Sequence, residues 1–255
     1  MEHQEDYILQ KRLIDLSRMA NRKGIVTFSN FLNLNEQNLF HQVKADLETS
    51  YQLSGGYEFA ERQMIAFIPD ALSYALPKEE WQYPIVCLRF YPKNQKFAEE
   101  LSHRDILGAL MHLGVDRSRI GDIKSNGSDY YIFCEEGIAD YLLQFLDQIR
   151  HTSVKGEAAE PSVLLEQKFE RLEGIVTSQR LDSIVSLLTK KSRKQSVSYI
   201  QAQKVFVNAC IVTANSYECK NNDVISVRGF GKYIYKGSSG QTRKGRMKVT
   251  LQKYI

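Results

Sequence analysis

The hydrophobic positions of the first eighty residues follow two patterns. Apolar residues recur at helical spacing over 9–20 and again over 39–47, and Asn35 is the expected N-cap of the second helix. The stretch between the two helices is expected to be a loop. The apolar run 64–68 then predicts a strand that ends at a proline. We therefore expect a mixed α/β domain over residues 1–80.

The next segment, residues 83–155, alternates strand and helix patterns in a familiar order. The predicted elements are a strand over 85–90, a helix begun by Ser102, strands over 120–124 and 129–134, a helix over 138–149 and a strand from 152. An Asn-Gly pair between the two middle strands indicates a tight hairpin turn. The order β-α-β-β-α-β is that of a ferredoxin-like domain.

RNA-recognition modules use the same order of elements and stack bases on aromatic side chains of their central strands. Candidates for that role are Tyr91, Tyr130 or Tyr131, and Phe133. Because the strands lack the usual aromatic signature of such modules, packing in the core is the favoured interpretation of these aromatics.

Two short helices and several strands are expected in the last segment, residues 180–255. Apolar residues over 181–188 form one helical face, and Ser192 is the expected N-cap of a second helix that buries Val197 and Ile200. Strands are predicted over 205–208 and 223–228. Residues 156–179, polar at first and then extended, are expected to be a linker to this domain.

Charge distinguishes this last segment from the rest of the chain. From Arg180 onward there are fifteen lysines and arginines against three acids, a net charge of +12, although the whole chain carries only +4. Residues 1–179 must therefore carry −8. Such asymmetry indicates a polyanionic partner at the basic end, rather than a merely solvated basic surface.

The basic residues include a candidate phosphate site. Arg193 and Lys194 fall in the first turn of the helix that Ser192 caps, where backbone N–H groups and the helix dipole favour an anion. The full set predicted to contact the polyanion is Arg180, Ser192, Arg193, Lys194, Lys204, Asn208, Arg228, Lys232, Lys236, Arg243, Lys244 and Arg246.

Several sequence strings resemble known families. One set of strings is Arg180-Leu181-Asp182, Ser192-Arg193, Val205 to Asn208 and Asn222 to Gly231. This set resembles the alpha-L RNA-binding domain, which occurs in a small-subunit ribosomal protein, tyrosyl-tRNA synthetases and pseudouridine synthases. A second set is Gly55-Gly56-Tyr57 with Ala60-Glu61-Arg62, Ser102 to Leu110, Arg228 to Lys232 and Thr242 to Arg246. This set resembles the bacterial YlmH family. The second resemblance spans most of the chain.

The chain departs from the alpha-L pattern at three positions. Gln203 stands where a helix-ending glycine is usual, Ala209 where glycine is common and Ser196 where alanine is usual. If φ is positive at Gln203, the missing glycine costs roughly 1 kcal/mol.

Catalytic and metal-binding motifs are weak. Pseudouridine synthases carry a catalytic Asp in a triplet similar to Arg180-Leu181-Asp182, but the flanking residues differ here. The favoured interpretation is a structural acid at a helix N-terminus that faces the helix dipole or pairs with Arg180. The four cysteines form no CxxC pair, and the histidines lack partners at ligand spacing. We expect no catalytic residue, no metal and no cofactor.

The expected fold class is α+β, with the ferredoxin-like domain between the mixed segment and a small alpha-L domain. The YlmH resemblance implies a non-enzymatic factor that binds large-subunit ribosomal RNA, and possibly tRNA or peptidyl-tRNA, in ribosome-associated quality control. The alternative is an RNA-modifying enzyme, similar to pseudouridine synthases, that uses the basic domain for docking. No apolar run is long enough to cross a membrane, so a cytoplasmic protein is expected, without a membrane or small-molecule partner.

Overall fold

The computed structural model describes residues 2–73, 81–160 and 169–254. The chain forms two compact units, Met1–Leu165 and Glu166–Ile255. Helices and antiparallel sheets occur in both, so the predicted α+β class is confirmed.

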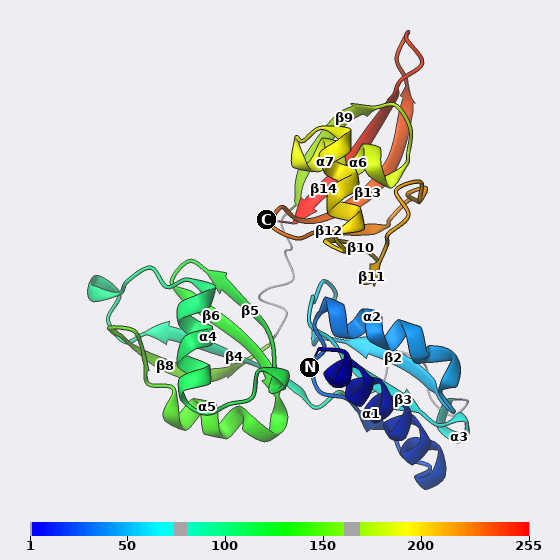
Figure 1. Ribbon diagram of the computed structural model, residues 1–255. Helices are drawn as coiled ribbons and strands as arrows, with labels where there is room; N and C mark the ends of the chain where they lie inside the picture. The colour runs from blue at the N-terminus through cyan, green and yellow to red at the C-terminus, as the bar shows by residue number, and fades with distance from the viewer. Residues whose placement is uncertain (1, 74–80, 161–168, 255) are drawn as a thin grey trace. The chain divides into compact units, whose positions relative to one another are not determined.

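Two helices cover one face of a small sheet at the start of the first unit (Figure 1). The elements are α1 (Glu2–Lys23), β1 (Thr27–Phe28), α2 (Leu34–Val43), β2 (Ser50–Ser54), β3 (Met64–Ile68) and α3 (Asp70–Ser73), with sheet order β1-β3-β2. Every residue of the central strand β3 is buried, and Leu13, Phe40 and Phe67 meet in the core.

Three details of this region differ from the prediction. Asn33, not Asn35, caps α2: its side chain accepts the N–H groups of Asn35 and Glu36, while Glu36 accepts the N–H of Asn33. The stretch expected to be a loop contains the strand β1, which pairs with β3. Helix α2 ends at Val43, and the helical pattern continues only as the 3₁₀ turn η1 (Lys44–Asp46).

The ferredoxin-like order of the central domain is confirmed. Its elements are β4 (Ile85–Pro92), α4 (His103–His112), β5 (Ile120–Asn126), β6 (Asp129–Glu135), α5 (Ala139–Phe145), β7 (Gln148–Ile149) and β8 (Thr152–Ala159). The sheet order is β5-β6-β4-β8-β7, and α4 and α5 pack on one face of it. Ser102 caps α4 as expected, and Gly127 supplies the positive φ of the hairpin turn.

The second helix of this domain is shorter than its apolar pattern. Helix α5 ends at Phe145, and Ile149 lies in the strand β7 instead, where it is buried. Short 3₁₀ turns occupy the connections, namely η2 (Gln95–Phe97), η3 (Arg117–Arg119) and η4 (Glu136–Ile138).

A loop that we call the clasp, Gly55–Arg62, fastens the small sheet to the central domain. The Asp122 carboxylate accepts hydrogen bonds from the Tyr57 hydroxyl at 2.6 Å and from the backbone N–H groups of Glu61 and Arg62 at 2.7 and 3.0 Å. The Arg62 guanidinium donates to backbone carbonyls, including that of Ile120. Arg62 is therefore half-buried, and its guanidinium group is bound within the protein.

In the second unit, two helices cover one face of a six-stranded sheet (Figure 1). The elements are β9 (Phe169–Val176), α6 (Leu181–Thr189), α7 (Arg193–Gln201), β10 (Val205–Val207), β11 (Cys210–Ile211), β12 (Val224–Val227), β13 (Gly231–Gln241) and β14 (Met247–Tyr254). The order is β11-β10-β12-β13-β14-β9, with neighbouring strands antiparallel.

The prediction of a linker over 156–179 is wrong at both ends. Residues 156–159 belong to β8, and β9 pairs along its whole length with β14, from Phe169 opposite Tyr254 to Val176 opposite Met247. The middle of that segment, 161–168, lies outside the described residues.

The buried side of helix α7 differs in part from the prediction. Ile200 is buried as expected, but the other buried residue of the helix is Ser196, and Val197 is only half-buried.

Candidate nucleic-acid interface

A buried carboxylate joins the starts of α6 and α7. Asp182 has a side chain only 2% exposed, and its oxygens accept hydrogen bonds from Arg180 at 3.2 and 3.4 Å and from Arg193 at 3.0 and 3.1 Å. The two arginines are 36% and 54% exposed. Asp182 therefore holds two guanidinium groups at the surface where the helices meet.

The electrostatics of this cluster keep Asp182 ionised. Burial by itself would raise the pKa of Asp182, but the hydrogen bonds from Arg193 and Arg180, together with their charges, lower it below its usual value. The predicted pairing with Arg180 is confirmed. Arg193 was predicted to contact the polyanion, and part of its donor capacity is used on Asp182.

The start of α7 carries a complete capping box. The Ser192 hydroxyl accepts the Gln195 N–H at 3.3 Å, and the Gln195 side chain accepts the Ser192 N–H at 3.1 Å. Ser192 thus has a structural role, and the cations beside it, Lys191 and Lys194, have exposed side chains. Lys191 was not among the predicted contact residues, although it directly precedes Ser192 and is exposed.

Asn208 also has a structural role. Together with Ala209 it forms the two-residue turn between β10 and β11, with φ values of 50° and 63°. Its amide nitrogen donates to Asp223 at 2.8 Å and its oxygen accepts the Val224 N–H at 2.9 Å. Its prediction as a polyanion contact therefore lacks support from this geometry.

Lys204 and Arg228 lie together beyond the C-terminal end of α7. The Arg228 N–H donates to the Lys204 carbonyl at 2.9 Å, which places the two residues on neighbouring chain segments. The Lys204 ammonium lies 5.6 Å from the centre of the Tyr199 ring. These two residues form a second cationic group, separated from Arg193 by the length of α7, about 13 Å.

The remaining predicted residues lie along the hairpin β13–β14. Arg243, Lys244 and Arg246 occupy its exposed turn, which Thr242 and Arg246 close through a 2.7 Å backbone hydrogen bond. This turn extends beyond the other elements of the unit (Figure 1). Lys232 and Lys236 lie on β13 farther from the turn. The Lys232 ammonium lies over the Tyr254 ring, and the Lys236 ammonium donates to the Asn222 side chain.

The aromatics of the ferredoxin-like domain are not arranged as a base-stacking surface. Tyr130, Tyr131 and Phe133 are at most 3% exposed. Tyr57 from the clasp stacks on Phe133 with ring centres 4.8 Å apart, and the Arg89 guanidinium lies 5.0 Å from the centre of the half-buried Tyr91 ring. These contacts favour the packing interpretation.

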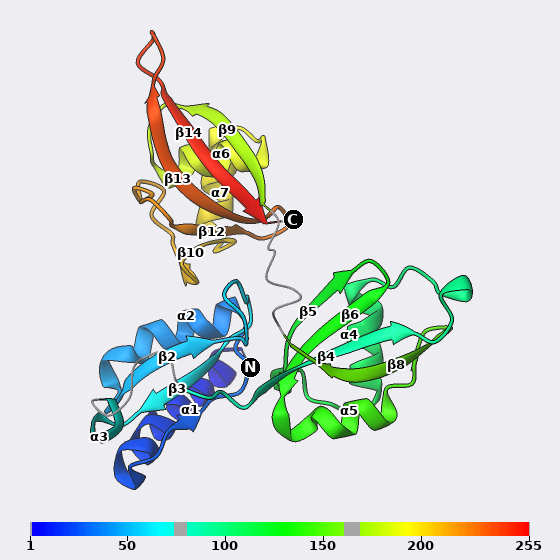
Figure 2. The same ribbon diagram turned by 180° about the vertical axis from the view of Figure 1, so that it is seen from behind.

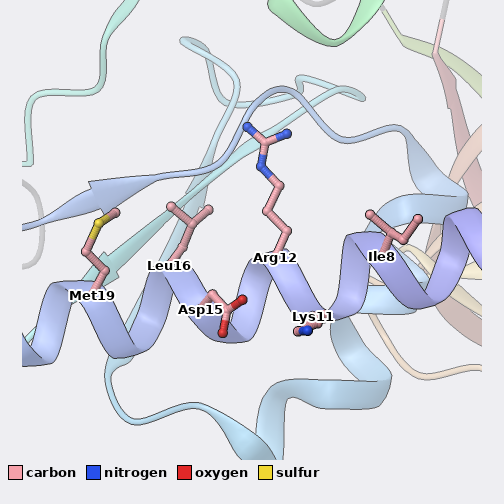
Figure 3. Close-up of a pocket in the computed structure, with 6 residues that line it drawn as sticks. All are labelled: Ile8, Lys11, Arg12, Asp15, Leu16 and Met19. Carbon is pink, nitrogen blue, oxygen red and sulfur yellow. The ribbon is translucent and has the colours of Figure 1, made fainter.

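A shallow apolar hollow of about 470 Å³ lies along α1. Ile8, Arg12, Leu16 and Met19 project from one side of the helix toward it (Figure 3). Arg12 donates a 3.2 Å hydrogen bond to Asn30. The lining holds no pair of nucleophile and base, so it gives no support to an enzymatic site.

Metal chemistry has no support either within the described ranges. Across residues 2–73, 81–160 and 169–254, no three His, Cys, Asp or Glu side chains come together as a metal-binding group. Burial raises the pKa values of Cys87, Cys134 and Cys219 to about 12, so these thiols are protonated at neutral pH. No helix in those ranges is both long and apolar enough to cross a bilayer.

Comparisons with known proteins place similarity along most of the chain. Residues 78–162 match the model of a family described as "Putative RNA-binding domain in YlmH". The chain is 27% identical over 247 residues to the "Ribosome-associated protein quality control protein P2" of Bacillus subtilis (strain 168), covering 94% of this chain and 92% of that protein.

The fold is similar to a solved structure as well. The "Cell division protein ylmH from Streptococcus pneumoniae" gives a TM-score of 0.51 at 20% identity, covering 64% of this chain and 95% of that chain. The segment that matches the family model contains the ferredoxin-like domain, whereas the predicted contact residues all lie after it.

Proposed function

Because the chain belongs to the YlmH family, we propose that it is an RNA-binding, ribosome-associated factor whose basic C-terminal unit is the main contact with structured RNA. The proposed targets are ribosomal RNA of the large subunit and tRNA. The proposed role is non-enzymatic, in cytoplasmic ribosome-associated quality control, which is the process that the name of the Bacillus subtilis relative states for that protein.

One observation carries this proposal. From Arg180 onward the chain has fifteen lysines and arginines and three acids, and two of those acids are buried. Asp182 is 1% exposed and Asp223 is 5% exposed, each bonded inside the protein, which leaves Glu218 as the exposed acid of this stretch. The surface is thus more basic than the net charge indicates, as phosphate binding requires.

The ferredoxin-like domain has the opposite balance. Residues 81–160 contain nine lysines and arginines and twelve acids. Since phosphate contacts dominate RNA affinity, the C-terminal unit supplies most of it, and the central domain adds recognition of shape or of a protein neighbour. We further propose that the two helices and following strands of the basic unit are an alpha-L RNA-binding domain.

The RNA grip is proposed to use Arg180, Arg193, Lys194, Lys204 and Arg228 on the helix side, together with the hairpin turn. The five helix-side contacts alone predict a slope of about −3.5 to −4.5 in the logarithm of affinity against the logarithm of salt concentration, and the three cations of the turn make it steeper by about 2–3 units. Fluorescence anisotropy with a tRNA transcript and with a large-subunit ribosomal RNA hairpin measures this slope directly.

A matched pair of variants makes the test specific. Lys191→Glu with Lys194→Glu changes two exposed side chains of the helix side, and Arg22→Glu with Lys23→Glu changes the net charge equally at the end of α1. We expect the first pair to weaken binding at least about tenfold and the second to change it less than about twofold. Equal losses in both would show that net charge alone drives binding.

A further inference from the structure

Strand β9 is the outermost strand of its sheet, and its outer edge is open. It pairs along its whole length with β14, beside which it lies in Figure 2, and among the described residues no other strand pairs with it. Within residues 170–176, the backbone N–H and C=O groups that point away from β14 make no hydrogen bond to any described residue. Such a row of unpaired groups is a template for a further strand.

The side chains on one side of β9 are exposed. Arg171 and Glu173 project from the same side, because they are two residues apart, and they form an ion pair at 2.7 Å with 72% and 65% of their side chains exposed. Their direct partners on β14, Gln252 and Thr250, carry no charge. Ile175 follows on the same side and is 55% exposed. This side of the edge therefore presents one cation, one anion and an apolar residue to solvent.

The order of the two charges is complementary to itself. When two copies of β9 run antiparallel with Leu172 opposite its own counterpart, Arg171 of each copy lies opposite Glu173 of the other. Pairing centred on Arg171 or on Glu173 instead places like charges opposite each other, which is unfavourable. A row of like charges on an edge strand repels a second copy, whereas these two charges attract one in a single register.

The helix side of β9 fits the same register. Leu172 is half-buried and packs against the core of the unit, so the two copies bring their leucines together. Glu170 of each copy comes to lie opposite Gly174 of the other, which has no side chain to obstruct it. Glu170 itself is paired with Lys253 of its own chain at 3.7 Å, so it adds no uncompensated charge to the contact.

We propose that β9 is the edge through which a second copy of this chain associates, in an antiparallel strand pair centred on Leu172. The two-fold axis of such a pair is perpendicular to the sheet, so α6 and α7 of both copies cover the same side. One pair of edge strands buries little surface compared with the interface of a stable dimer, so the association depends on concentration. The inference is independent of RNA binding.

Charge variants of the full-length protein test the pairing. Arg171→Glu and Glu173→Arg each change an exposed side chain, and each places like charges opposite each other in the proposed register. Sedimentation velocity is measured without RNA over a range of protein concentrations. We expect the wild type to dimerise as its concentration rises, and each variant alone to self-associate at least about tenfold more weakly.

A mixture of the two variants is the matched control for folding. In a pair made of one copy of each, residues 171 and 173 again meet opposite charges at both positions. We therefore expect an equimolar mixture of Arg171→Glu and Glu173→Arg to dimerise at concentrations at which each variant alone is monomeric.

A disulfide reports the register. Leu172→Cys places the two Cβ atoms about 4.5–5.5 Å apart across the strand pair, close enough for a disulfide after a small adjustment. Glu170→Cys places the two copies of residue 170 four positions out of register, about 13 Å apart along the strands. We expect mild oxidation to link the first variant into a covalent dimer and to leave the second unlinked.

The contrary results are equally definite. A wild type that stays monomeric at every soluble concentration overturns the inference. Self-association that survives in Arg171→Glu and Glu173→Arg, or that the mixture of the two fails to restore, uses another surface and overturns it as well. Cross-linking of Glu170→Cys as readily as of Leu172→Cys contradicts the register. None of these results bears on the proposed function, which RNA affinity tests separately.

Discussion

Asp182 organises the start of the basic unit at the scale of a single residue. Its carboxylate is the shared acceptor of Arg180 and Arg193, so replacing it leaves two guanidinium groups with weaker partners. We predict that Asp182→Asn destabilises the second unit by about 2 kcal/mol at pH 7, since hydrogen bonds to a charged group contribute about 1.5–3 kcal/mol. Hydrogen exchange of the α6 and α7 amides in the full chain measures this loss.

The pH dependence follows from the sign of the shift. The pKa of Asp182 is lower in the folded protein than its ordinary value of 3.8, so its contribution is present above pH 3.8 and is lost as the pH falls through the folded value. The difference between wild type and Asp182→Asn should therefore shrink below about pH 3.8. A difference that persists unchanged at lower pH would rule out the ion pair as its cause.

Gln203 stores backbone strain that glycine would relieve. Its φ is 56°, and its side chain is exposed, so the residue gains nothing visible from that conformation. We predict that Gln203→Gly stabilises the unit by about 0.5–1 kcal/mol. Ala202→Gly is the matched control, because φ there is −77°, and glycine should destabilise it. Equal effects in the two variants would contradict the assignment of strain.

The role of a single residue could be predicted from the sequence where one local rule determines it. The cap at Ser192 was predicted from a local rule, and strain at Gln203 was predicted for the case that its φ is positive, as it is. The roles of Arg193 and Asn208 were not, because each depends on an acid distant in the sequence, Asp182 for one and Asp223 for the other. Tertiary partners of this kind leave no local signature.

At the scale of elements, we propose that the hairpin β13–β14 contributes a separable part of the RNA affinity. Its turn residues Arg243, Lys244 and Arg246 are exposed, while Gly245 and Thr242 keep the turn closed. We predict that replacing the three cations by alanine makes the salt slope shallower by about 2–3 units with structured RNA. Anisotropy titrations between low and high salt test this, and an unchanged slope would exclude the turn from the interface.

The clasp is the element that joins the small sheet to the central domain. Asp122 accepts three hydrogen bonds there, whereas the Tyr57 hydroxyl contributes one of them. We predict that Asp122→Asn costs about 2–3 kcal/mol of stability and Tyr57→Phe about 1 kcal/mol. Urea unfolding followed by the fluorescence of Trp81, the chain's single tryptophan, reports on this unit. Equal effects would show that the backbone contacts of Asp122 add nothing.

Elements were predictable to the extent that their own periodicity defines them. The ferredoxin-like order followed from strand and helix patterns together with the Asn-Gly turn. Strand β9 was assigned to a linker because the polar residues Glu170, Arg171 and Glu173 lie on an edge strand, where charge is favoured. Only its pairing with β14, more than seventy residues later, makes it part of the sheet.

At the scale of the whole molecule, charge is divided unevenly along the chain. The residues before Arg180 carry −8 and those from Arg180 onward carry +12, so a large RNA assembly attracts one part of the chain and repels the other. This division predicts one dominant RNA contact per molecule, with the acidic part left to meet protein or solvent.

Sedimentation with ribosomal particles tests the central claim most directly. Wild type, the Lys191→Glu with Lys194→Glu variant and the Arg22→Glu with Lys23→Glu control are run on sucrose gradients with separated subunits at low salt. We predict that the wild type and the control sediment with the large subunit, whereas the helix-side variant stays at the top. A wild type that stays at the top would contradict the ribosomal assignment, and a helix-side variant that sediments fully would contradict the proposed grip.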